Sequence, residues 1–344
     1  MSTASLPVAA TRGRRIAVLP LACALLVALA LAAIGVGHYP LPLREVLDVL
    51  LQPLRGGPVD ATAGAIVWQI RLPRIGVAAL VGAALAGAGA AFQQLFRNPL
   101  VAPDTLGVSS GAALGAVLAI MAGASFVLVQ VAAFAGGILA VAVVMAIASR
   151  LTAHDPLVTL ILTGVVVASL LGAGISLAKY VADPYNQLPA ITFWLMGSLA
   201  SATTRELAAL WLPEVAALAV LGALAWRINL LALAEDEARA LGVPTRALRG
   251  IVIACATLAT AAAVAVTGVI GWVGLIVPHM ARMIVGPEFS RLLPLSAVTG
   301  AIFMLVIDTA ARSLLTIELP PGILTAVVGT PLFLALLAGA RRES

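Results

Sequence analysis

The chain has 344 residues, of which 62% are apolar and 10% are charged, and its 20 cations outnumber its 15 anions to give a net charge of +5. This composition excludes a water-soluble globular protein, because the folded surface would expose large contiguous apolar patches. The arginines stand singly in short polar segments and do not form a basic patch with interleaved aromatic residues, which excludes a nucleic-acid-binding surface.

Apolar runs follow one another along the whole chain. A helix needs roughly 20 apolar residues to cross a bilayer core about 30 Å thick, and most of the runs have that length. The alternation of apolar and polar residues typical of a membrane barrel strand is absent, so the predicted fold class is all-α. We expect about ten membrane-spanning helices, at residues 16–36, 75–96, 106–122, 126–148, 157–178, 207–226, 251–266, 269–277, 292–311 and 323–340.

The first and eighth runs differ from the others in their flanking residues and in their length. The first follows Arg12, Arg14 and Arg15 and could be a secretory signal, but it is long for one and ends at a poor cleavage site, so we interpret it as a span. The eighth, 269–277, is too short to cross a bilayer unless residues 280–285 extend it or protein shields its ends.

The distribution of cations predicts the orientation of the chain. With the N-terminus in the cytoplasm, 13 of the 20 cations fall in inside segments and the other 7 in outside segments. Membrane proteins carry an excess of arginine and lysine on the cytoplasmic side. Both termini are therefore expected to be cytoplasmic.

Two segments between the spans are predicted to hold short helices. Residues 187–197 are apolar enough to lie at the outer membrane interface, with Phe193 and Trp194 as anchors. Residues 229–249 form the longest polar inside segment, and their pattern predicts one helix that ends before Gly242 and Pro244. This second segment should project from the membrane.

Residues for catalysis or metal binding are not grouped in the sequence. The only lysine, Lys179, does not follow a glycine-rich phosphate loop, so the chain is not expected to hydrolyse ATP. The histidines (His38, His154 and His279) and the cysteines (Cys23 and Cys255) have no partners at catalytic or metal-ligand spacing. We expect no catalytic residue and no metal site.

An ion-coupled carrier would need an ionisable group near the middle of the bilayer. The candidates are Glu214, in the sixth run, and Asp308, in the ninth. Asp308 lies four residues before Arg312, so an ion pair within one helix explains both residues. A secondary transporter therefore stays as a weaker alternative to a transporter powered by another chain.

Five stretches of sequence resemble the FecCD family of ABC-importer permeases, which serve iron siderophores, haem and cobalamin. They are RLPR (71–74), GAALAGAGAAFQQLFRNPLVAPDTLGVSSGA (82–112), ALGVP (240–244), GWVGLIVPHMAR (271–282) and ELPPGILTAVVGTPLF (318–333). They occur in the family's order and spacing, and the resemblance covers nearly the whole chain.

The resemblance implies the architecture and the partners. It implies one permease domain over residues 1–344, with the type II ABC importer fold of ten helices, in the bacterial inner membrane. The partners would be a second copy of the chain, two cytoplasmic ATPase subunits that bind ATP and Mg, and a periplasmic substrate-binding protein. The chain itself would bind no cofactor and would be a transport subunit, not an enzyme.

Roles for outward-facing arginines follow from the same resemblance. In the family, arginines at the positions of Arg71, Arg74 and Arg312 dock acidic residues of the binding protein. An arginine fork pairs well with a carboxylate, which agrees with this role. The alternative is that these side chains reach the membrane interface or pair internally with Asp308 or Glu318.

The resemblance also implies roles on the cytoplasmic side. Within 229–249, ATPase coupling is expected of five residues: Leu233, Glu235, Ala240, Leu241 and Gly242. Arg97, Asn98 and Pro99 match the family's cytoplasmic turn, and Leu157 and Val158 lie where the family has its cytoplasmic gate. His279 lies in the family's IVPHMAR motif and is interpreted as structural, with a haem-ligand role as the alternative.

The cargo is the least determined part of the prediction. Most members of the family carry iron chelates, so a siderophore or haem is the first expectation and cobalamin is the alternative. The apolar gate residues imply a path that interacts weakly with a bulky ligand.

Overall fold

The computed structural model describes residues 18–37, 39–56, 60–151 and 155–340, and all regular structure in these ranges is helical. Seven helices are long and apolar enough to cross a membrane. They are α2 (Val18–Gly35), the continuous stretch Ala61–Leu95, α7 (Phe126–Ala148), α8 (Pro156–Val181), α10 (Thr204–Ala223), α13 (Thr245–Thr267) and α15 (Phe289–Ala311). Three further apolar helices are shorter or less completely described: α6 (Val108–Met121), α14 (Val273–Val285) and α16 (Pro321–Ala340). The prediction of a polytopic all-α membrane protein is confirmed.

Each of the ten predicted runs overlaps one of these helices. The second run begins earlier than predicted, because α4 (Ala61–Ala65) and the π-helix η1 (Ile66–Arg71) lead without a break into α5 (Leu72–Leu95). The eighth run was placed too early. Gly268 and Trp272 both have positive φ, which prevents a helix there, and α14 starts only at Val273 and continues to Val285.

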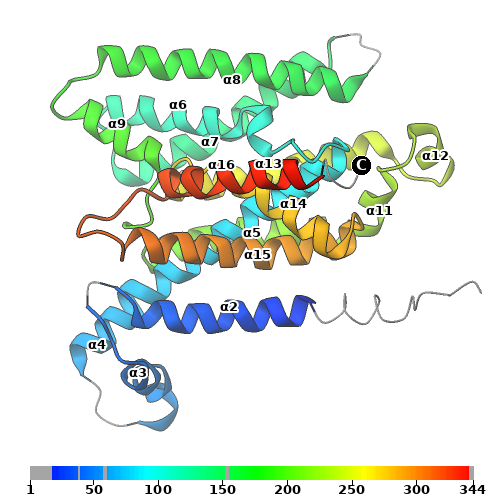
Figure 1. The fold of residues 1–344 in the computed structure, drawn as a ribbon. Helices are drawn as coiled ribbons and strands as arrows, with labels where there is room; N and C mark the ends of the chain where they lie inside the picture. The colour runs from blue at the N-terminus through cyan, green and yellow to red at the C-terminus, as the bar shows by residue number, and fades with distance from the viewer. Residues whose placement is uncertain (1–17, 38, 57–59, 152–154, 341–344) are drawn as a thin grey trace, which may run out of the picture.

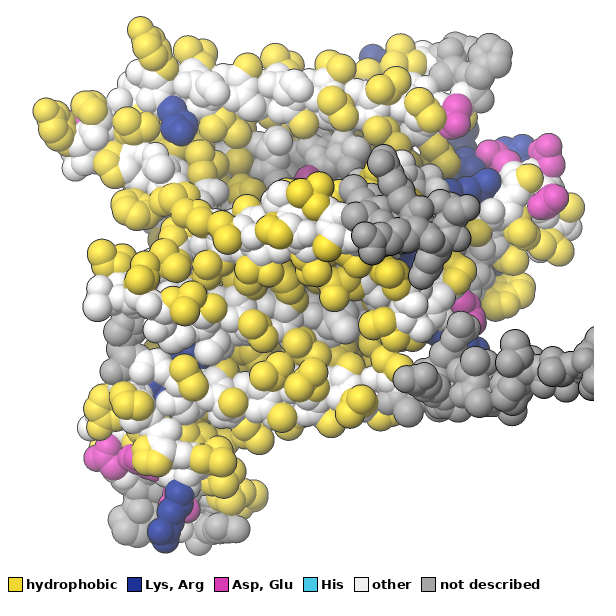
Figure 2. All heavy atoms as spheres, viewed as in Figure 1, with side chains coloured by type: hydrophobic (Ala, Val, Ile, Leu, Met, Phe, Trp, Pro, Cys, Tyr) yellow, Lys and Arg dark blue, Asp and Glu magenta, His cyan; other side chains and the backbone are white. Residues whose placement is uncertain are grey.

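The helices lie side by side, and the shorter elements mark the two ends of the bundle (Figure 1). At one end are α11 (Ala225–Leu230) and α12 (Glu235–Ala240), together with the start of α2 and the end of α16; we call it the α12 end. At the other are α3 (Leu43–Arg55), α4 and α9 (Gln187–Met196); we call it the α9 end. Charged side chains gather mostly at these two ends and leave an apolar belt between them (Figure 2).

Helix α5 is the centre of the core. It contacts α10, α13, α14 and α15, and nearly all of its residues are buried. Glycines make the close contacts possible: a Cβ at Gly82 would lie 2.1 Å from the carbonyl oxygen of Gly300 in α15, and one at Gly89 would lie 1.8 Å from that of Gly274 in α14. Small residues at helix crossings supply packing where lipid gives no hydrophobic drive for association.

Of the two segments predicted to hold one short helix each, one does so and the other does not. Residues 187–196 form α9 as expected, and Gln187 fixes its start by donating to the carbonyl oxygen of Met121 at 3.0 Å. Residues 229–249 do not form a single helix, because α11 ends at Leu230 and α12 starts at Glu235. Three acidic residues in the first turn of α12 favour this new start, since they interact well with the helix dipole.

Candidate functional site

Arginines from two helices meet at the α9 end. Arg74, in the first turn of α5, donates from Nε to Asp308 Oδ1 of α15 at 2.9 Å. Its two terminal nitrogens form a fork with the carboxylate of Glu318, at 2.9 and 3.0 Å. Asp308 is fully buried, and Arg74 is 9% exposed. This geometry gives a bidentate, charge-assisted contact between the start of α5 and the chain around the end of α15, 234 and 244 residues away in sequence.

Arg71 and Arg312 hold the end of α2. Arg71 donates to the carbonyl oxygens of Ile34 and Tyr39, and Arg312 donates to those of Ala33 and Val36, at 2.5 and 2.6 Å. The last carbonyl groups of a helix lack partners within the helix, and cations near that end are favourable. The two guanidinium groups therefore cap the C-terminus of α2.

The ion pair predicted within α15 is present. Arg312 Nε lies 3.5 Å from Asp308 Oδ2, so Asp308 stands between Arg74 and Arg312. Burial lowers the pKa of the Arg312 guanidinium, and the Asp308 carboxylate opposes that shift. The group remains protonated, as arginine does in proteins. We call Arg71, Arg74, Asp308, Arg312 and Glu318 the arginine network.

The structure brings the three candidate docking arginines together, and all three are buried. Their exposed fractions are 6% for Arg71, 9% for Arg74 and 6% for Arg312. The accessible member of the network is Glu318, whose side chain is 38% exposed. This geometry agrees with the internal pairing that was the alternative to docking, and it makes Glu318 the group that a partner would reach first.

The cytoplasmic turn predicted after α5 adopts a strained conformation. Arg97 has a φ of 51°, which is uncommon for a residue with a side chain. The side-chain oxygen of Asn98 accepts from the backbone nitrogen of Leu100 at 2.9 Å and fixes the turn that contains Pro99. Arg97 donates to the carbonyl oxygens of Leu231, at 3.0 Å, and of Leu233. The turn is thereby tied to the segment between α11 and α12.

The residues predicted for ATPase coupling lie in and around α12. Glu235 pairs with Arg239 and, at 3.1 Å, with Arg249 in the first turns of α13. The other four, Leu233, Ala240, Leu241 and Gly242, are exposed, and Leu241 is 61% exposed. Gly242 has a φ of 76°, which ends α12 as predicted. The segment presents a small apolar surface at the α12 end.

The predicted gate residues form the first turn of α8. Asp155 caps this helix by accepting from the backbone nitrogens of Leu157, at 2.9 Å, and Val158, at 3.2 Å. Leu157 packs partly against the core, and Val158 is 50% exposed. A constriction at Val158 thus requires a second surface opposite it. His154, next to this turn, lies outside the described residues.

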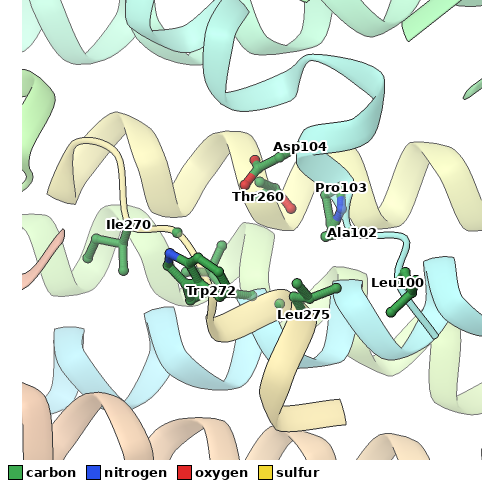
Figure 3. A pocket seen from close by; sticks show the side chains of 11 residues that line it. Leu100, Ala102, Pro103, Asp104, Thr260, Ile270, Trp272 and Leu275 are labelled. Carbon is green, nitrogen blue, oxygen red and sulfur yellow. The ribbon is translucent and has the colours of Figure 1, made fainter. Parts of the chain in front are cut away.

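A cavity of about 290 Å³ lies between α5, residues 100–104, α13 and α14. Asp104 and Thr260 lie on one side of it, and Trp272 and Leu275 lie on the other (Figure 3). Asp104 accepts a hydrogen bond from Ser109, and Trp272 has a φ of 72°. We did not predict either residue as part of a site; the two glycines near Trp272, Gly268 and Gly271, were the available signal.

Glu214 is a further ionisable group that the structure places inside the bundle. It lies in α10, directly after Pro213, and is 0% exposed. Both of its carboxylate oxygens lack a hydrogen-bond partner among the described residues. The sequence had marked it as a candidate for ion coupling, which would require a partner or a water-filled path.

No group of three or more histidine, cysteine or acidic side chains could hold a metal ion within the described ranges. Cys23 and Cys255 are both free. His279 lies in α14, one turn before Arg282, and lines a polar cavity at the α12 end. His38, like His154, lies outside the described residues.

Known proteins match this chain along most of its length. The sequence profile of the FecCD transport family matches residues 25–339. The chain is 40% identical over 318 residues to the molybdate import system permease protein MolB of Haemophilus influenzae, with 92% of this chain and 94% of MolB covered. It is 45% identical over 298 residues to the cobalamin import system permease protein BtuC of Halobacterium salinarum, with 86% and 79% covered.

A third relative and a solved structure are similar to this chain over a comparable length. The hemin transport system permease protein HmuU of Yersinia pestis is 40% identical over 289 residues, with 80% of this chain and 84% of HmuU covered. A metal-chelate type ABC transporter solved in an inward-facing conformation has a TM-score of 0.85 and 39% identity, with 94% of this chain and 99% of that chain covered. The chain therefore belongs to the FecCD transport family and is a multi-pass permease of the ABC-importer type.

Proposed function

We propose that this chain is the membrane-spanning subunit of an importer that moves an iron chelate, a siderophore complex or haem, from periplasm to cytoplasm. The observation that carries the proposal is the exposed segment around α12, whose backbone Arg97 ties to the end of α5. A membrane bundle without a phosphate-binding loop needs such a segment to receive movement from another chain.

The proposed partners follow from the same observation. Two ATPase subunits, which bind ATP and Mg, would contact the exposed surface of Leu233, Ala240, Leu241 and Gly242 at the α12 end. That end would be the cytoplasmic one, as the charge distribution predicts, and the start of α2 and the end of α16 lie there. A second copy of the chain is proposed to complete the path, as the resemblance to the family implies.

Docking of a periplasmic binding protein is proposed at the arginine network. An incoming carboxylate would compete with Glu318 for the fork of Arg74, because Glu318 is the exposed acid of that pair. Removing this competitor with Glu318→Gln should tighten binding of the binding protein about tenfold, equivalent to ~1.4 kcal/mol. Binding to nanodisc-embedded complex can be measured by surface plasmon resonance.

The matched control for docking is Glu288→Gln. Glu288 pairs with Arg291 at the start of α15, at the opposite end from the network. This variant should leave the affinity unchanged. An affinity that is also unchanged in Glu318→Gln would assign the network a purely structural role.

The proposed cargo depends on the gate. Leu157 and Val158 offer no hydrogen-bond donor to a bare anion, whereas paths for anions are lined by donors or cations. An iron chelate presents an organic exterior that suits an apolar constriction. Cobalamin does so too and is the alternative cargo, while molybdate, which the relative MolB is named for, fits this gate less well.

The test is reconstitution in proteoliposomes with the cognate ATPase and binding protein. We expect uptake of iron-55-labelled siderophore or haem that requires ATP. Uptake of cobalamin or molybdate instead would overturn the cargo and leave the permease assignment in place. Uptake driven by an ion gradient, with this chain alone in the membrane, would favour the secondary transporter and remove the whole proposal.

A further inference from the structure

A polar cavity of about 320 Å³ opens at the α12 end, between the last turn of α5, the turn after it, and α14. Its polar lining consists of Gln93, Gln94, Arg97, Asn98, His279 and Arg282. None of the lining residues is acidic. The cavity therefore joins two guanidinium groups and an imidazole without a carboxylate to balance them.

The two arginines that line this cavity have no acidic partner among the described residues. Neither Arg97 nor Arg282 has a carboxylate within 4 Å in the part of the chain that the structure describes, whereas Arg74 and Arg312 both pair with Asp308. Arg97 is exposed and Arg282 is half-buried, and like charges on the lining of one cavity repel one another. An anion in the cavity would offset this repulsion.

The hydrogen-bonding groups around the cavity are also incomplete. Arg282 has one weak contact, from Nη1 to Gln94 Oε1 at 3.4 Å, and its enclosed Nε and Nη2 have no acceptor among the described residues. His279 Nδ1 likewise lacks a partner there. Polar groups enclosed in a native protein are nearly always paired, and an exception indicates an ion, a water molecule or a function.

Gln93 narrows the chemistry of the ligand. It is 1% exposed, and its Nε2 donates to the carbonyl oxygen of Leu275 at 3.0 Å, which orients the amide. Its Oε1 has no donor among the described side chains and backbone groups. The site thus combines several donors and cations with one unused acceptor. Hydrogen phosphate satisfies both, because it is an anion that keeps an O–H near neutral pH, whereas sulfate has no proton to donate.

We infer that this cavity binds a phosphate group, with Arg97 and Arg282 as its charge partners, His279 as a donor and Gln93 as the acceptor for a P–OH. The group is either inorganic phosphate or the phosphomonoester headgroup of phosphatidic acid, since both keep a P–OH near neutral pH. Arg97 also holds the carbonyl groups of Leu231 and Leu233, so an occupied site would strengthen the attachment of the α12 segment. The inference rests on the proposed function only for the cytoplasmic location of this end.

The test uses the full-length protein in phosphatidylcholine nanodiscs, in chloride buffer free of phosphate. Inorganic phosphate is titrated by calorimetry, and the melting temperature is measured alongside, because a ligand of the folded state raises it. We expect saturable binding of phosphate at least about tenfold tighter than binding of sulfate. Arg282→Gln should abolish it.

Two further variants keep the result interpretable. Arg291→Gln removes an arginine that pairs with Glu288 outside the cavity, and it should bind phosphate like the wild type. If Arg282→Gln does not fold, Arg282→Lys tests the same point, since it keeps the charge but loses the fork and should bind about tenfold more weakly.

Nanodiscs of a different lipid composition distinguish inorganic phosphate from a lipid headgroup. Nanodiscs with phosphatidic acid should leave phosphate binding intact if the ligand is inorganic phosphate. A lipid-dependent rise in melting temperature that Arg282→Gln abolishes, with no response to phosphate, would assign the site to a lipid headgroup. The inference is overturned if neither probe binds, or if Arg291→Gln weakens binding as much as Arg282→Gln does. This experiment does not measure uptake by the complex, so the result of the binding test is independent of the transport assay.

Discussion

At the scale of single residues, the arginine network shows how a membrane bundle holds three guanidinium groups at one end. Asp308 is fully buried and lies between Arg74 and Arg312, while backbone carbonyl groups at the end of α2 accept from the terminal nitrogens of Arg312. A buried charge is tolerated only when it is paired and hydrogen-bonded. Each charged member of the network therefore depends on the others for the pairing that makes its burial tolerable.

Loss of Arg74 should be costly. Arg74→Ala leaves Asp308 with one contact, to Arg312 at 3.5 Å, and we expect a loss of about 3–5 kcal/mol in the free energy of unfolding. Unfolding in mixed micelles measures it. In the control Arg291→Ala, the lost pair is about half exposed, and the change should stay below about 1 kcal/mol. Equal stability of the two variants would contradict the role of the network.

Glu214 gives a second prediction at this scale. Its carboxyl group is enclosed and lacks a partner among the described residues, so a neutral isostere should fit. Glu214→Gln should keep both the melting temperature and ATP-driven uptake. Glu214→Lys should lower the free energy of unfolding by at least about 2.5 kcal/mol, because it puts a charge in the membrane-embedded core. Loss of uptake in a folded Glu214→Gln protein would instead support ion coupling.

At the scale of elements, the close crossings of α5 decide how the bundle packs. Gly82 of α5 faces Gly300 of α15, and Gly89 faces Gly274 of α14, each backbone to backbone. Because lipid is as apolar as the helix surfaces, such contacts are a main source of association between helices. A side chain placed there separates the two backbones.

A matched pair of glycine variants tests these crossings. Gly82→Ala would put its Cβ 2.1 Å from the Gly300 carbonyl oxygen and should destabilise the fold by about 1–3 kcal/mol. Gly250→Ala, in α13, meets no atom within 4 Å and should be neutral or stabilising by up to about 1 kcal/mol. Unfolding in micelles compares them, and a neutral Gly82→Ala would show that the α5–α15 contact is looser than the structure indicates.

At the scale of the whole molecule, Arg97 connects the central helix to the surface proposed for the ATPase. The guanidinium group of Arg97, in the strained turn after α5, donates to the backbone before α12, so a movement of α12 would reach α5 through this contact. The exposed apolar side chains of the segment are not involved in this link. Assembly with an ATPase and transmission of its movement can therefore be separated.

Arg97→Ala should uncouple the transporter. We expect the ATPase to co-purify as before, because Leu233 and Leu241 are unchanged, and ATP-driven uptake to fall about tenfold, or ~1.4 kcal/mol in coupling. The control is Arg227→Ala, at the same end, whose exposed side chain makes no hydrogen bond or ion pair with the described residues. Full uptake by Arg97→Ala would refute a transmitting role.

The sequence alone determined that this chain lies in a lipid bilayer and where its helices fall. Two local features predict the all-α membrane fold: apolar runs of membrane length, and the glycine and proline breakers between them. A third local feature, the missing phosphate loop, predicts that the chain does not hydrolyse ATP. The coincidence of predicted and observed boundaries is closest at α7, residues 126–148. It failed at α14, where Trp272 takes a positive φ that no apolar run can signal.

Apart from the local pair of Asp308 and Arg312, only the tertiary structure decided what the charged residues contact. Arg74 meets Asp308 and Glu318 across 234 and 244 residues of chain, and Arg97 meets Leu231 across 134. The same long-range contact fixes the backbone between α11 and α12, where one helix was expected. Contacts of this kind depend on which helices cross and at what depth, and that depends on the packing of the whole bundle, so no local pattern of residues encodes them.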